Sequence, residues 1–447
     1  MRHLRRLAAP TGVIAFSLLL LASSRPAMGE AAPPAGTLAI RAGRLIDGTG
    51  SAPARNVVIL IENGRIARVG ADVAIPGGTR VVDLSSATVL PGLIDAHVHL
   101  TGRHIGEGEN WEDSSVRDLP QADAIRGVRN ARLTLEAGFT TVRNVGASDF
   151  SDVALRDMIA AGVVPGPRIL AAGHSLGITG GHCDTNGYRP GLFDPDIRQG
   201  VADGIEQVTA SVRYQIKHGA DVIKFCATGG VLSEGDAVGV QQYSLEEMTA
   251  IVAASHMAER KVAAHAHGNE GIKVAVRAGV DSIEHGSTLD EEAIALMKRQ
   301  GTFLVPTLMA QEAVERQAKT GVLTGLRAEK ALHIAPIGRR SFAMAAKAGV
   351  KIALGTDAGV FPHGTNGHEL TLMVQNGLKP MAAIVAGTSG AAELLGLSAE
   401  IGSIQPGRMA DIVAVAGDPL ETIALLEQVG FVMKAGAIVK DGITARP

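Results

Sequence analysis

The chain is short of cysteine, aromatic residues and clustered positive charge. Its 447 residues include two cysteines, one tryptophan and three tyrosines, and the formal net charge is −3. No run of lysine and arginine follows the N-terminal segment. An aromatic-lined sugar or nucleic-acid groove is therefore not expected, and nucleic-acid binding has no electrostatic support. For Cys183 and Cys226 we predict two free thiols, with a bridge as the alternative, because a large core needs few disulfides.

The first 29 residues differ in composition from the rest of the chain. Arg2, Arg5 and Arg6 precede an apolar run over 13–22, and small residues surround a possible cleavage site near 27–29. The run is too short to span a membrane comfortably, so the pattern predicts a signal peptide over 1–29. We expect an exported, periplasmic or secreted protein without a stable membrane span. An uncleaved N-terminal anchor is the alternative.

The remaining sequence contains two kinds of secondary-structure pattern. Residues 30–90 and 401–447 read as short strands with turns, including a hairpin at Asn63-Gly64, and predict a composite β-sandwich domain built from both termini. Residues 91–400 alternate apolar strands with helices, such as 244–259 with its capping serine Ser244, and predict a (β/α)8 TIM barrel. The eight expected strands are 90–100, 139–145, 168–172, 221–226, 261–265, 282–285, 303–306 and 350–355.

The most informative segment is Gly-Leu-Ile-Asp-Ala-His-Val-His at 92–99. Side chains alternate in a strand, so His97 and His99 point the same way. Two neutral imidazoles on one side form half a site for a divalent ion such as zinc. For this segment alone, a pair of histidines in a solvated loop is the alternative.

Further polar groups stand singly at the ends of other expected strands, where the functional groups of a barrel collect. They are Lys224, His265, His285 and Asp357. Taken alone, His285 could be a core histidine and Asp357 could cap a turn. Together with the first two histidines, the set predicts a metal centre.

Lys224 lies in the apolar run 221–226 and points into the barrel if that strand alternates. A buried lysine tends to lose its proton. The neutral amine can then add carbon dioxide to form a carbamate, whose two oxygens can bridge two metals. An ordinary lysine whose head reaches solvent is the alternative.

With these residues the chain resembles the amidohydrolase superfamily, in its imidazolonepropionase-like and Xaa-Pro dipeptidase-like (metal-dependent carboxypeptidase) branch. The matching segments are 89–99, 138–143, 219–224, 262–267, 282–286, 355–357 and 402–413. The resemblance implies two divalent metal ions, most simply zinc. The implied ligands are His97 and His99 for the first ion, His265 and His285 for the second, carboxylated Lys224 between them, and Asp357 on the first.

The resemblance also implies a mechanism, in which a metal-bridging hydroxide attacks a carbonyl. Asp357 would take the proton of the hydroxide and deliver it to the leaving nitrogen. On the strand that ends near 265, His267 is the alternative ligand, and His265 is preferred because it lies nearer the end of the apolar run. Six side chains are candidates for contacting the substrate: His182, Tyr243, His267, Arg143, His363 and His368.

The sequence thus predicts a metal-dependent amidohydrolase that cleaves the amide bond of a dipeptide or N-acyl amino acid. Ochratoxin-like amides are possible substrates by the same resemblance. The alternatives are hydrolysis of a cyclic (imidazolone-like) amide, a lactone or an organophosphate ester, and a non-catalytic binding protein on the same scaffold. Similar proteins are commonly dimers or larger rings, so a homo-oligomer is expected.

Overall fold

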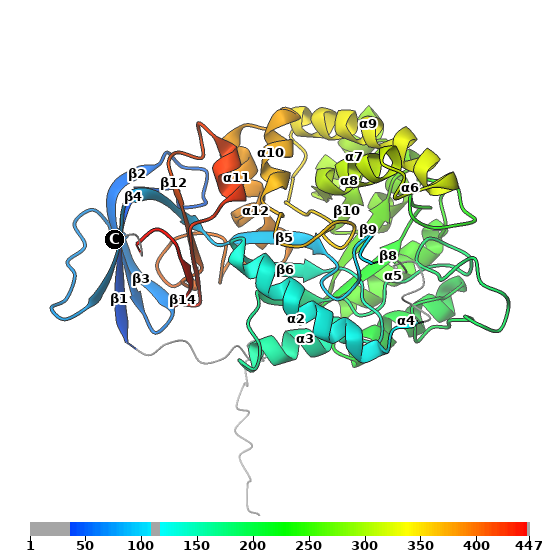
Figure 1. Cartoon of the computed structure of the whole chain (residues 1–447). Coiled ribbons are helices and arrows are strands. Elements are labelled where there is room, and N and C mark those ends of the chain that lie inside the picture. The colour runs from blue at the N-terminus through cyan, green and yellow to red at the C-terminus, as the bar shows by residue number, and fades with distance from the viewer. Residues whose placement is uncertain (1–35, 109–116, 445–447) are drawn as a thin grey trace, which may run out of the picture.

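The computed structural model describes residues 36–108 and 117–444. It is an α/β structure with two regions, a mostly antiparallel sheet at one end and parallel strands surrounded by helices at the other (Figure 1). The predicted signal peptide over 1–29 lies outside the described residues.

One region is a seven-stranded sheet that joins the two ends of the chain. Its order is β14-β13-β12-β4-β1-β2-β3. The strands are β1 (Thr37–Leu45), β2 (Ala54–Glu62), β3 (Arg65–Gly70), β4 (Arg80–Pro91), β12 (Ile412–Ala416), β13 (Phe431–Lys434) and β14 (Ala437–Asp441). The expected hairpin is confirmed, since Asn63 and Gly64 both take positive φ (50° and 76°) between β2 and β3. An apolar cluster that includes Ile40, Ile59 and Phe431 forms the core of this region.

The other region contains two parallel sheets. Their orders are β5-β6-β7 and β11-β10-β9-β8. The strands are β5 (Leu93–Val98), β6 (Phe139–Asn144), β7 (Arg168–Ala171), β8 (Val222–Cys226), β9 (Lys261–Ala266), β10 (Ser282–His285) and β11 (Phe303–Val305). Seven of the eight expected strands are therefore present, each within a few residues of its predicted bounds.

The eighth expected strand, 350–355, is wrong. This described segment forms only an isolated parallel bridge, from Ile352 to Leu304. Its neighbour Leu354 donates its backbone N–H to Ala386 and accepts from Ala96 on β5. The hydrogen bonds of the segment 350–355 thus go to several different elements and form no continuous ladder. They still connect β11 to β5.

Helices cover the parallel strands on the outside (Figure 1). They are α2 (Pro120–Glu136), α3 (Ser151–Ala160), α4 (Gly204–Lys217), α5 (Leu245–Met257), α6 (Asn269–Ala278), α7 (Glu291–Gln300), α8 (Leu308–Lys319), α9 (Gly325–Ala348), α10 (His368–Gln375), α11 (Pro380–Ala386), α12 (Ser389–Leu394) and the 3-10 helix η1 (Ile423–Glu427). The predicted cap of α5 is confirmed, because Ser244 and Glu247 form a reciprocal capping box. The strands and helices enclose the largest apolar cluster of the protein.

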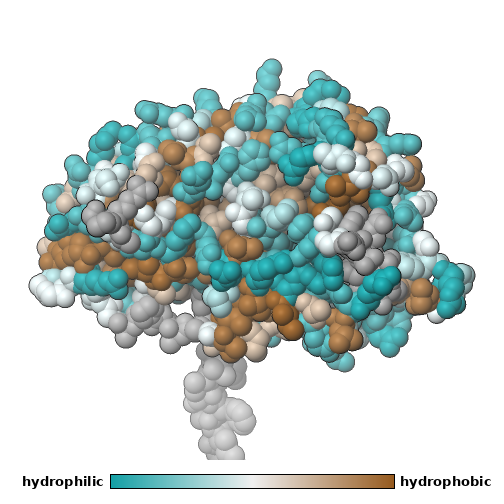
Figure 2. Space-filling view, viewed as in Figure 1, coloured by the Kyte–Doolittle hydropathy of each residue, from teal (hydrophilic) through white to brown (hydrophobic). Residues whose placement is uncertain are grey.

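The face shown in Figure 2 carries mostly hydrophilic residues, interrupted by separate apolar patches. Within 36–108 and 117–444, no helix is both long and apolar enough to cross a membrane.

Candidate metal centre

A cavity of about 780 Å³ opens where the parallel strands end. All the predicted ligands line it: His97, His99, Lys224, His265, His267, His285 and Asp357. They lie on or directly after β5, β8, β9 and β10 and in the segment between α9 and α10, so the topology gathers side chains that span 260 positions of sequence.

The first ligand group consists of His97, His99 and Asp357, whose ligand atoms lie within 4.8 Å of one another. Oδ1 of Asp357 lies 3.4 Å from Nε2 of both histidines. Nδ1 of His97 is 2.8 Å from Glu284, and Nδ1 of His99 is 3.0 Å from the carbonyl of Gly146. With Nδ1 taken up in this way, both rings present Nε2 to the centre of the group.

A buried ion pair supports the first group. Glu284 and Arg143 are both buried, and Nη2 of Arg143 donates to Oε1 of Glu284 at 2.8 Å. Burial alone would raise the pKa of Glu284, but the guanidinium and the hydrogen bond from His97 outweigh it and lower the pKa to about 2. Glu284 is therefore an anion that fixes the orientation of His97.

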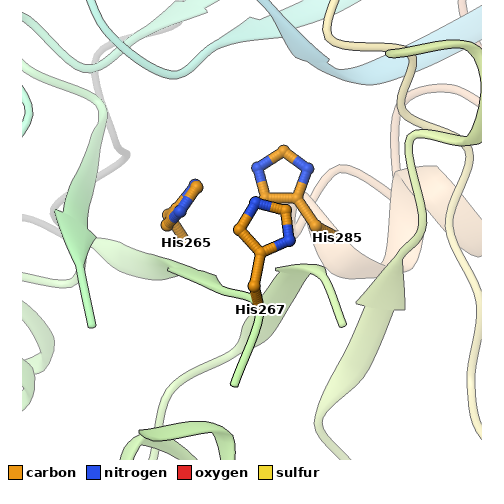
Figure 3. Close-up of side chains that lie close together, drawn as sticks. All are labelled: His265, His267 and His285. Atoms are coloured by element: carbon orange, nitrogen blue, oxygen red, sulfur yellow. The ribbon is translucent and has the colours of Figure 1, made fainter. Parts of the chain in front are cut away.

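The second group consists of His265, His267 and His285 (Figure 3). Neutral hydroxyls hold two of these rings, since Nδ1 of His267 lies 2.7 Å from Ser287 Oγ and Nδ1 of His285 lies 2.7 Å from Thr307 Oγ1. Burial lowers the pKa of all three imidazoles, that of His267 to about 3. They are neutral at pH 7, the form that binds a metal.

The donor set fits divalent metal ions. Nε2 of His265 is buried and has no hydrogen-bond partner. In the other four histidines the supporting hydrogen bond is made by Nδ1, which leaves Nε2 available to a metal. Such a cluster of neutral imidazoles with one carboxylate is a ligand set for zinc or a similar ion. The two groups together are consistent with a binuclear centre.

The backbone around the ligands is tightly fixed and locally strained. Oδ1 of Asp95 accepts hydrogen bonds from the backbone of both His97 and Thr356, which ties β5 to the turn that carries Asp357. His285 and Asp357 take positive φ (72° and 62°), which non-glycine residues rarely adopt. Strain of this kind persists where the surrounding structure fixes a functional side chain.

Lys224 lies in the same cavity with 4% of its surface exposed. Burial lowers its pKa to about 8, against the opposing effect of Glu284 and Asp357. Lys224 therefore loses its proton more readily than an exposed lysine, which is the direction that carbamate formation requires.

Of the residues predicted to contact substrate, His182 and His267 line the cavity and four others do not. Tyr243 is buried and donates its hydroxyl to Ala202, and Arg143 is engaged behind the first ligand group. His363 is buried against the carbonyl of His99, and His368 lies between two surface glutamates. For these four the structure corrects the prediction, because other contacts occupy their polar atoms away from the cavity.

The prediction of free thiols is also wrong. Cys183 and Cys226 form a disulfide with their Cα atoms 5.8 Å apart. Three further residues that support the ligands were not predicted from the sequence: Glu284, Asp95 and Thr307. Glu284 offered a signal, because it is a charged residue inside the expected strand 282–285, and a buried charge needs a partner.

The fold and the site together define an α/β protein with two candidate metal-ligand groups in one cavity. Residues 88–439 match the amidohydrolase family, and the chain belongs to that family.

Three similar proteins illustrate the relationship. The ochratoxinase of Aspergillus niger is 34% identical over 93% of this chain and 89% of its own length. The crystal structure of a Xaa-Pro dipeptidase with methionine bound in the active site is 41% identical, with a TM-score of 0.86 over 90% of this chain and 99% of that one. The imidazolonepropionase of Rhizorhabdus wittichii is 26% identical over 82% of this chain and 89% of its own. The resemblance found in the sequence is thereby confirmed.

Proposed function

We propose that the protein is a binuclear, zinc-dependent amidohydrolase that cleaves the amide bond of a dipeptide or an N-acyl amino acid. The observation that carries this proposal is the convergence of two ligand groups in one cavity, with the second nitrogen of four histidines already engaged. A similar ochratoxinase and a similar Xaa-Pro dipeptidase support the choice of an amide between an acyl group and an amino acid.

The proposal includes the architecture. The parallel strands and the segment 350–358 form a (β/α)8 barrel over 91–400, and residues 30–90 with 401–447 form a separate composite β domain. The parallel bridges from Leu304 to Ile352 and from Val98 to Ala358 support closure of the barrel. The separate apolar cluster of the seven-stranded sheet supports the division into domains.

Two groups of the chain have chemical roles in this proposal. When bound, divalent cations lower the pKa of a water molecule and polarise the scissile carbonyl. Oδ1 of Asp357, close to Nε2 of His97 and His99, accepts a proton from the attacking water and returns it to the leaving nitrogen. Nζ of Lys224 adds carbon dioxide with loss of a proton, and the carbamate oxygens join the ligand set.

The substrate groups follow from the cavity lining. His182 is the predicted contact residue that faces the cavity from outside both ligand groups, and it binds the amide or the carboxylate of the substrate. Apolar residues of α8, of α9 and of the turn after Asp357, such as Val314, Ile334 and Val360, line another part of the cavity and suit an apolar side chain.

The test is a screen of the metal-reconstituted protein against dipeptides and N-acyl amino acids, assayed by amine release, with metal content measured in parallel. We expect about two ions per chain and loss of activity on chelation. Cleavage of cyclic amides, lactones or organophosphate esters but not of linear amides would replace the substrate assignment. A metal-free preparation with full activity, or a metal-loaded one that cleaves none of these compounds, would reject the proposal.

A further inference from the structure

We propose that the Cys183–Cys226 disulfide is a positioning element of the active site. It holds the ring of His182 against His265, so that opening the bond lowers turnover without unfolding the protein. The kinetic part of this inference rests on the proposed amidohydrolase function, whereas its structural part does not.

The disulfide lies directly beside the ligands. Cys226 is the last residue of β8, two residues after Lys224, and it pairs in register with His265 on β9. Cys183 follows His182 in the long connection from β7 to α4. Both cysteines line the cavity, and 43 positions separate them in sequence. The bond therefore attaches a loop to the strand that carries Lys224.

The base of this loop does not depend on the disulfide. The backbone of Leu176 donates to Lys224 and accepts from Cys226, and Gly177 donates to Gly200. The first two of these bonds pair the chain after β7 with β8, as the parallel bridge from Leu176 to Phe225 shows. They act six residues before His182, so they fix where the loop begins and leave its tip to other contacts.

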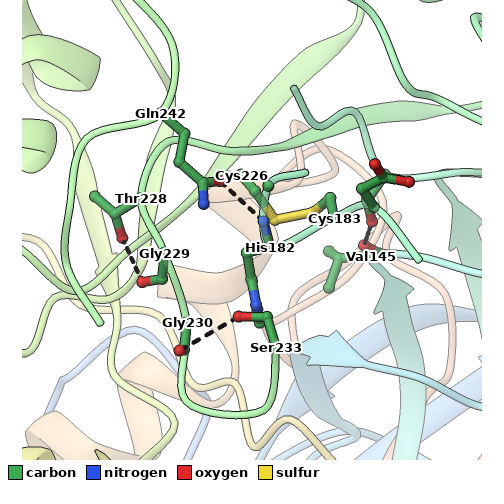
Figure 4. The surroundings of a disulfide bond; sticks show 12 residues. Val145, His182, Cys183, Cys226, Thr228, Gly229, Gly230, Ser233 and Gln242 are labelled. Atoms are coloured by element: carbon green, nitrogen blue, oxygen red, sulfur yellow. Dashed lines mark hydrogen bonds between the residues drawn. A yellow bond between two sulfur atoms is a disulfide. The ribbon is translucent and has the colours of Figure 1, made fainter. Parts of the chain in front are cut away.

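At the tip, few directional contacts hold the ring of His182 (Figure 4). Its backbone N–H donates to Oε1 of Gln242 at 3.1 Å. Its Nδ1 is buried and has no hydrogen-bond partner. The ring instead packs against His265, with centroids 4.2 Å apart, and over Gly230, where an added Cβ would lie 2.2 Å from it. Packing alone sets the ring position, so the main chain beside it must be held firmly.

The facing wall is anchored independently. The buried Nζ of Lys330 donates to the carbonyls of Gly230 and Ser233 and to Asp236. Gly230 therefore stays in place when the disulfide opens. In the contact between His182 and Gly230, the disulfide therefore controls only the position of His182. A displacement of about 1 Å from a reactive arrangement can lower the rate by orders of magnitude.

The chemistry of opening is a two-electron reduction. A dithiol reductant exchanges with the bond, two thiols form on the protein, and the reductant becomes a cyclic disulfide. A phosphine reductant instead takes the oxygen of water and becomes a phosphine oxide, and the two protons of that water complete the thiols. The phosphine suits the experiment, because it leaves no added thiol to bind the metal.

The experiment compares the oxidised and phosphine-reduced full-length protein in three measurements. They are free thiols per chain, hydrogen exchange of the segment 177–186 and kcat and KM for an amide found in the screen. The variant C183S/C226S repeats the comparison without a reductant. Metal content and thermal midpoint are measured in each state, and assays are kept below the midpoint.

We expect two thiols per reduced chain, faster exchange in 177–186 and unchanged exchange in the β2–β3 hairpin. Turnover should fall by about tenfold or more with metal retained. His182→Ala supplies the decisive control: it is slow when oxidised and should lose less than about twofold further on reduction. Equal losses in H182A and the natural sequence would show that the bond does not act through His182.

The inference is overturned if two thiols appear while loop exchange and turnover both stay unchanged. It is also overturned if the loss of turnover follows global unfolding or metal loss. If the oxidised protein cleaves no amide, the proposed function fails, but hydrogen exchange still decides whether the bond positions the loop.

Discussion

The two ligand groups differ in what stands behind them. Behind His97 lies an ionised glutamate, Glu284, neutralised by Arg143. Behind His285 lies the hydroxyl of Thr307, at the start of α8, and the residues that follow Thr307 donate two backbone N–H groups to the buried Glu369. In the first group, an ion pair therefore orients His97. In the second group, a neutral hydroxyl orients His285.

The two buried glutamates show what this difference means energetically. Glu284 has a guanidinium at 2.8 Å, and its pKa falls to about 2. Glu369 has backbone donors in place of a cation, and burial raises its pKa to about 8. Two backbone hydrogen bonds at the start of a helix therefore do not compensate for burial here, whereas an ion pair does. The carboxyl beside His97 is therefore held as an anion, whereas burial favours the protonated form of the carboxyl behind Thr307 and His285.

Removing the carboxylate that distinguishes the first group from the second should have the largest effect. For Asp357→Asn we expect kcat/KM to fall by about 10³-fold or more, because the proton acceptor and one ligand are lost together. Steady-state kinetics with metal analysis measures this. The matched control is Asp149→Asn, the same change at an exposed position of the same cavity, which should stay within about threefold. Equal losses in both variants would contradict the assignment.

The supports themselves can be compared through metal affinity. Glu284→Gln removes the charged partner of His97, and Thr307→Val removes the neutral partner of His285. Loss of such an outer partner typically costs about 10- to 100-fold in metal affinity. We expect the glutamate variant to show the larger loss, measured by competition with a chelator.

Glu284→Gln should also destabilise the metal-free protein by about 3–5 kcal/mol, because it leaves Arg143 buried without its anion. The control is E284Q/R143M, which removes both charges. It should recover part of the stability while keeping the weak metal affinity. Recovery of both properties would show that Glu284 does not orient His97.

The sequence predicted which side chains gather in the cavity, because each of them depends on a local pattern. His97 and His99 are two apart in a strand, and His285 and Lys224 occur in short apolar runs whose ends had to meet in a parallel arrangement. The topology could then be inferred from the alternation of strands and helices. The Asn63-Gly64 turn and the α5 cap were predictable for the same reason, since their signals lie within a few residues.

What the sequence could not predict depends on distant partners. Arg143 carries a charge of the kind that binds substrates, so its sequence alone allowed that role. Only the position of Glu284, 141 residues away, shows that Arg143 is buried in an ion pair. Tyr243 and the two cysteines are similar cases. The segment 350–355 has a strand-like sequence, but the irregular spacing of its partners Leu304, Ala96 and Ala386 prevents a ladder.

The last expected effect concerns the pH dependence of stability and tests the contrast between the two glutamates. An unfolded Glu369 loses its proton near its ordinary pKa of 4.5, and the folded one near 8. Between these values the folded protein binds one more proton, so the free energy of unfolding falls as pH rises. The slope is at most about 1.4 kcal/mol per pH unit.

Glu369→Gln cannot titrate and should lack this slope, although it also loses one acceptor for the start of α8. Urea unfolding of the metal-free protein at pH 5, 6.5 and 8 measures the difference between the two proteins, in which other titrating groups cancel. Glu329→Gln, on the exposed face of α9, should follow the natural protein at every pH. Parallel curves for E369Q and the natural sequence would mean that Glu369 is ionised throughout. Its two backbone donors would then compensate for burial as effectively as the cation beside Glu284, and the contrast between the two supports would disappear.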